Sequence, residues 1–69
     1  MPLSLAQIGE GYTVKKVGGK PEVRQHLMDL GFVEGSNVRV VSCLAGSMII
    51  EVKNVRIALN RDMTNKIMI

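Results

Sequence analysis

The side chains best suited to chemistry in this chain are those of its single histidine, His26, and its single cysteine, Cys43. A nucleophilic thiol needs a base to activate it and a third group to orient that base. His26 falls on the polar side of a predicted helix and Cys43 on a predicted strand, and no motif brings them together. A half-buried apolar side chain is the more common role for such a cysteine. The residues therefore support no catalytic site, and we expect a protein that is not an enzyme.

Three potential metal ligands, Glu22, His26 and Asp29, share one strip of that predicted helix. Side chains at this spacing are neighbours, and carboxylate and imidazole groups can bind a divalent ion. Any solvated amphipathic helix also presents a polar strip of this kind, and that is the more common explanation. We therefore expect no tightly bound cofactor, while a weak site for a divalent transition metal stays open.

The helix that carries these residues is predicted from Pro21 to Leu30, with an apolar stripe along one side. Proline suits the first helical position, where its missing N–H costs nothing. Gly31 follows where the backbone needs a positive φ, and Phe32 can fold back onto Leu27 in a Schellman-type stop. A type II turn is predicted next, over residues 33–36.

Most of the remaining chain is predicted as short strands, because valine and isoleucine are abundant and favour them. The first strand needs a bulge near Lys15, since Val14 and Val17 fall on opposite parities. Short helical turns are predicted at 3–8, with Ser4 as a cap, and at 60–64. The predicted strands are Tyr12–Val17, Val38–Cys43, Met48–Val52, Val55–Leu59 and Lys66–Ile69. Hairpin connections between them predict a mainly β fold, a small closed or nearly closed barrel of about five strands with one α-helix.

Length and composition indicate one globular domain, residues 1–69, with 46% apolar residues and a net charge of +3. The cations are spread along the chain and only two residues are aromatic, so nucleic-acid binding is disfavoured. No signal peptide is visible, and the longest aliphatic run, Met48–Ile50, is far too short to span a bilayer. With one cysteine and no internal disulfide, we expect a cytoplasmic protein without membrane insertion.

Apolar side chains outside the predicted core are the candidates for a partner-binding surface. Ile49, Val41 and Cys43 fall on the outer side of the predicted hairpin, and Met28 lies at the edge of the helix stripe. An apolar anchor of this kind supplies affinity in protein contacts. Scattered apolar residues are also normal on small barrels, so both explanations stay open.

The string from Leu27 to Gly35, the hairpin strands, the segment Val55–Leu59 and the terminal Lys66–Ile69 together resemble the FeoA family. The opening Leu3–Ala6 is similar as well, so the likeness covers nearly the whole chain. Glu34 departs from the family pattern, in which a proline commonly precedes the glycine. The resemblance implies an SH3-like β-barrel and a small cytoplasmic protein of bacterial ferrous iron transport.

The resemblance also implies a non-enzymatic interaction module that modulates the FeoB membrane transporter through its cytoplasmic part. An alternative comes from the similar domain of diphtheria-toxin-repressor-type regulators. It is a metal-responsive regulatory domain, here binding a transition metal ion through Glu22, His26 and Asp29. The family has no catalytic residues to transfer, and neither the residues nor the resemblance indicates an oligomeric state.

Overall fold

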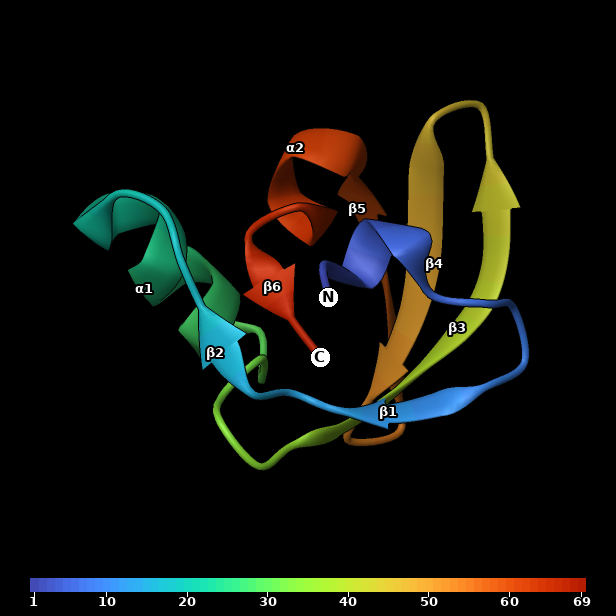
Figure 1. The fold of residues 1–69 in the computed structure, drawn as a ribbon, viewed down its shortest axis with the longest axis horizontal. Helices are drawn as coiled ribbons and strands as arrows, with labels where there is room; N and C mark the ends of the chain where they lie inside the picture. Colours follow the sequence, from blue (N-terminus) through green and yellow to red (C-terminus); the bar gives the residue numbers. More distant parts are fainter.

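The computed structural model describes residues 1–69, which form two antiparallel sheets, a nine-residue helix and two shorter helical turns (Figure 1). The elements in chain order are the 3₁₀ turn η1 (Leu3–Leu5), β1 (Gly11–Thr13), β2 (Lys16–Val17), α1 (Pro21–Asp29), β3 (Asn37–Leu44), β4 (Ser47–Val52), β5 (Val55–Asn60), α2 (Arg61–Thr64) and β6 (Ile67–Met68). One sheet has the order β1-β3-β4-β5, and the other pairs β2 with β6. Four of the five predicted strands therefore exist as single strands, and the segment predicted as the other divides between the two sheets.

The two hairpins β3–β4 and β4–β5 are present in the larger sheet, as predicted. Their turns have two residues each, and all four residues have positive φ: Ala45, Gly46, Lys53 and Asn54. This is the geometry of type I′ turns, whose twist matches that of the strands they join. The hairpins leave alternate β4 side chains buried on one side of the sheet, with the others half-buried on the opposite side.

The prediction of a single strand from Tyr12 to Val17 with a bulge is wrong, because the chain changes sheets in the middle of that segment. The Val14 N–H donates to the Ser36 carbonyl at 2.9 Å, on the side of the larger sheet. The next N–H, that of Lys15, donates to the Met68 carbonyl of β6 at 2.7 Å. A crossing between sheets, rather than a bulge, therefore places both valines of the segment in the core.

Helix α1 ends as the sequence predicts. Gly31 has a φ of +110°, and its N–H donates to the Met28 carbonyl at 3.0 Å. The Phe32 N–H donates to the Leu27 carbonyl at 3.0 Å, which completes a Schellman motif. The predicted turn after it is confirmed, since the Ser36 N–H donates to the Val33 carbonyl at 3.0 Å.

The short helical turns flank the terminal strands. The Asn60 side chain caps α2 by accepting a hydrogen bond from the Met63 N–H at 2.9 Å. Ser4 does not cap η1, contrary to the prediction, because it lies inside the turn and its hydroxyl donates to the Asn65 side chain. That bond ties η1 to the segment after α2, and both lie on the same side of β4 in Figure 1.

One core of thirteen buried apolar residues joins the two sheets and α1, and Tyr12 of β1 and Met63 of α2 pack against it. The largest fully buried side chain is Phe32, from the segment directly after α1. The other large members come from η1, α1, β4 and β6: Leu3, Leu27, Ile50 and Ile67. Because both sheets and the helix supply residues to it, this core fixes the positions of the surfaces described below.

Candidate functional site

The predicted metal strip lies on the solvent side of α1, where Glu22, His26 and Asp29 are all exposed. Asp29 is engaged by its own helix, since its Oδ1 accepts a hydrogen bond from Gln25 Nε2 at 2.9 Å. Nowhere in the structure do three or more His, Cys, Asp or Glu side chains gather closely enough to hold a metal ion. The strip therefore lies on the solvent-exposed face of α1.

In the structure, Cys43 is not part of the apolar patch that the sequence predicts on the outer side of the β3–β4 hairpin. A bulge at Val41 shifts the register, so that Ser42 rather than Val41 pairs with Ile49. Cys43 then pairs with the buried Met48, which places it on the opposite side of the sheet from Ile49. Cys43 is also exposed, so the prediction of a half-buried side chain is wrong.

Ile49 itself is half-buried between small neighbours, Ser42 on one side and Ala58 on the other. Towards the far end of the same face, Glu51 pairs across the strands with Arg39 and with Arg56. The Arg56 Nε lies 3.8 Å from the Glu51 Oε2, and 68% of the arginine side chain is exposed. An exposed ion pair of this kind adds little stability. The outer face is therefore a charged surface with modest apolar content.

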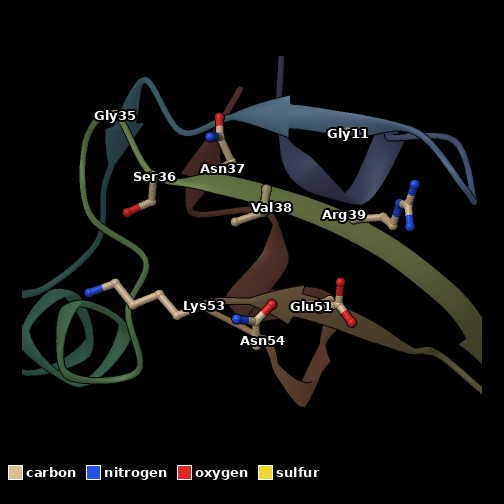
Figure 2. A pocket seen from close by; sticks show the side chains of 9 residues that line it. All are labelled: Gly11, Gly35, Ser36, Asn37, Val38, Arg39, Glu51, Lys53 and Asn54. Carbon is tan, nitrogen blue, oxygen red and sulfur yellow. The ribbon is translucent and has the colours of Figure 1, made fainter.

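Figure 2 shows the depression that this face forms beside β1. It is lined by Gly11, Gly35, Ser36, Asn37, Val38, Arg39, Glu51, Lys53 and Asn54. Arg39 and Glu51 lie at one end, and Ser36 and Lys53 at the other (Figure 2). Its only apolar lining residue, Val38, is 2% exposed, so the depression offers polar groups and no accessible apolar anchor.

A second groove runs between β2, α1 and the segment after the helix, and it contains Met28. The groove is lined by Lys16, Val17, Arg24, Met28, Val33 and Glu34. Met28 is 42% exposed, while Val17 is buried and Val33 half-buried beside it. Methionine is flexible and polarisable, so it adapts to the shape of a partner. This groove therefore combines an exposed apolar side chain with two cations and one carboxylate at its margin.

The sequence singles out Met28 but not the residues that surround it. Lys16 and Val17 reach the groove only because the chain crosses from the larger sheet into the smaller one. Val33 reaches it because the Schellman stop turns the chain back along α1. The groove can be predicted from the sequence only after the change of sheet at Val14 has been predicted.

The sequence and the fold of this chain are both similar to those of known proteins. Residues 1–69 match the sequence model of the family described as the FeoA domain. This chain belongs to the FeoA family. It is 35% identical over 68 residues to the "Putative Fe(2+) transport protein A" of Methanocaldococcus jannaschii, with 99% of this chain and 83% of that relative covered.

Two solved FeoA structures share the fold. A crystal structure of an iron uptake regulatory protein, FeoA, matches with a TM-score of 0.88 and 29% identity, over 97% of this chain and 91% of that chain. The FeoA of Stenotrophomonas maltophilia, described as an SH3 domain protein in complex with zinc, matches with a TM-score of 0.88. Its identity is 24%, over 99% of this chain and 87% of that chain. The predicted SH3-like fold is confirmed, although its strands form two sheets with six strands rather than one closed barrel of five.

The FeoA family is an accessory family of ferrous iron transport, so the predicted connection with iron uptake is confirmed at that level. None of the helices in this FeoA chain is long and apolar enough to cross a membrane.

Proposed function

We propose that this FeoA protein acts without catalysis, as a cytoplasmic accessory module that binds the cytoplasmic part of a FeoB-type iron transporter and modulates it. The observation that carries this proposal is the groove around Met28, which an exposed methionine lines together with Val17 and Val33. A desolvated apolar anchor supplies most of the affinity in a protein contact. Such binding changes transport only if the transporter's states differ in affinity for this surface.

Charge at the margin of the groove supports the same kind of partner. Lys16 and Arg24 flank the apolar residues, and the whole chain carries a net charge of +3. Cations at the rim of an interface attract an acidic surface and raise the association rate more than the affinity. An acidic patch around an apolar knob on the transporter therefore fits this groove.

The groove supports the proposal better than Ile49 and Val41 do. Both of those side chains are half-buried within the sheet, and Ile49 is surrounded by Ser42 and Ala58. Met28, at 42% exposed, projects further from the surface. We therefore rank Met28 above Ile49 and Val41 as the partner-binding residue, and the alternative surface becomes an outcome of the test.

The test measures binding of the isolated cytoplasmic domain of the FeoB-type transporter by calorimetry. Met28→Glu should weaken this binding about tenfold or more, since it places a carboxylate in the apolar contact. Leu44→Asp is the matched control, because Leu44 is 73% exposed at the tip of the β3–β4 hairpin, outside the groove. Both variants should keep the native circular dichroism spectrum. Normal binding by Met28→Glu would refute the groove, and loss of binding by Ile49→Asp alone would assign the contact to the outer sheet face.

A further inference from the structure

Strand β5 has a neighbouring strand on one side only. It is the last strand in the order β1-β3-β4-β5, and its six residues pair with β4 without interruption. No backbone hydrogen bond outside the regular elements involves any residue of β5. The pairing of the inner strand β3 with β4, by contrast, is interrupted by the bulge at Val41. The outer edge of β5 is therefore a regular strand edge with unpaired backbone groups.

The turn at the start of β5 shows which of its backbone groups are free. A two-residue turn makes Val52 and Val55 a hydrogen-bonded pair. Because hydrogen-bonded and non-hydrogen-bonded pairs alternate along an antiparallel ladder, Ile57 also directs its backbone groups to β4. The N–H and C=O groups of Arg56 and Ala58 therefore point to the open edge, where another strand could bind them.

The side chains of β5 leave apolar surface uncovered on one face of this edge. Val55 is 56% exposed and Ile57 is half-buried, and both lie on the side of the sheet that faces the core. Arg56 and Ala58 are exposed on the opposite side. An added strand with alternating side chains would thus cover Val55 and Ile57 with one set and face Arg56 with the other.

The charge around β5 favours acidic side chains in that second set. Residues 53–61 contain three cations, Lys53, Arg56 and Arg61, and no carboxylate. Arg56 forms an ion pair with Glu51, which belongs to β4 on the side away from the open edge. Opposite charges directly across two strands stabilise their pairing. A second copy of this chain would bring the same cations to the edge, so an acidic segment fits better.

We propose that β5 binds an extended segment of another protein as a fifth strand of the larger sheet, and that the segment alternates apolar with acidic side chains. Backbone hydrogen bonds to Arg56 and Ala58 supply affinity in this mode, and the side chains supply specificity. The site is separate from the groove around Met28. The proposal therefore holds or fails independently of the transporter contact.

The first experiment uses an acetylated and amidated decapeptide in which valine alternates with glutamate. At saturation it should slow amide hydrogen exchange of Arg56 and Ala58 about tenfold or more, since these N–H groups become hydrogen-bonded. A peptide with lysine in place of each glutamate should bind about tenfold more weakly. N-methylation of every second peptide residue, in the phase that donates to β5, should abolish binding. Absence of binding by the glutamate peptide, or binding whose largest effects fall on Met28, would overturn the proposal.

The second experiment uses variants of the edge. Ala58→Pro removes an N–H that β4 does not use, and proline is tolerated at such edge positions. It should abolish peptide binding, whereas Ala58→Val, which keeps the N–H, should bind normally. Arg56→Glu should reverse the preference in favour of the lysine peptide. Normal binding by a folded Ala58→Pro variant would refute the site, and self-association that only this variant loses would show that the edge binds a second copy instead.

If Ala58→Pro fails to fold, the N-methylated peptide and Arg56→Glu still test whether the peptide binds β5 as an added strand. Equal binding of the methylated and unmethylated peptides would show that strand pairing is not involved. Met28→Glu should leave affinity for the glutamate peptide unchanged, which separates this result from a failure of the transporter contact.

Discussion

At the scale of single residues, the strain in this fold is concentrated in the hairpin turns. Ala45, at a φ of +49°, is a non-glycine residue in the left-handed region, and Gly46 follows at +83°. A side chain with a Cβ pays about 1 kcal/mol in this region unless it can bond locally, as asparagine does. The β3–β4 turn therefore retains a strained alanine where the type I′ geometry prefers asparagine followed by glycine.

Ala45→Asn should therefore stabilise the protein, by about 0.5–1 kcal/mol, because it creates the preferred Asn-Gly pair of a type I′ turn. The measurement is the midpoint of urea unfolding, followed by circular dichroism. Gly46→Ala is the matched control: an added Cβ there meets no atom within 4 Å, so its expected destabilisation reports the φ of +83° alone. An Ala45→Asn variant less stable than the parent would show that this turn is not type I′ in solution.

At the scale of elements, helix α1 carries the three residues on which the metal-responsive alternative depends. Its exposed face carries Glu22, His26 and Asp29 without assembling them around a metal position. A tetrahedral metal site needs three or four ligands that converge from a rigid frame. One imidazole and two carboxylates on a single solvated helix face provide no such frame.

Titration of the protein with Zn²⁺, and with Fe²⁺ under anaerobic conditions, should therefore show no submicromolar binding by calorimetry. His26→Ala should leave the titration unchanged, and Gln25→Ala, which frees Asp29 from its hydrogen bond, serves as the comparison. Tight binding that His26→Ala abolishes would contradict this expectation and favour the metal-responsive alternative.

Elements whose signals are local were predictable from the sequence, and those set by tertiary pairing were not. The end of α1 at Gly31 and the turns of the two hairpins follow from residues within five positions of one another. The break at Val14 and the bulge at Val41 depend on which distant strand each segment pairs with. Because a one-residue shift moves a side chain to the other face, the unpredicted bulge also removed Cys43 from the predicted patch.

At the scale of the whole molecule, both sheets depend on one core. Phe32 is fully buried and is the largest side chain in it, and Ile67 of the smaller sheet and Ile50 of the larger one belong to the same cluster. The β2–β6 pair has only two residues in each strand, too few to be stable without that core. The groove around Met28, which includes Lys16 and Val17 of β2, therefore exists only while the core is intact.

Phe32→Ala should unfold both sheets together. A domain of this size has a stability of about 3–10 kcal/mol, and removing a buried phenylalanine costs about 3–5 kcal/mol.

Phe32→Leu loses less and should remain folded, so its unfolding can be followed at both sheets. Amide exchange at Lys15, whose N–H donates to the Met68 carbonyl of β6, and at Ile50 in β4 should accelerate by the same factor in that variant, because one cooperative transition opens both. Val55→Ala, at a side chain that is 56% exposed, is the control and should change stability by less than about 0.5 kcal/mol. Faster exchange at Lys15 alone would show that the smaller sheet opens independently, and the groove around Met28 would then open with it.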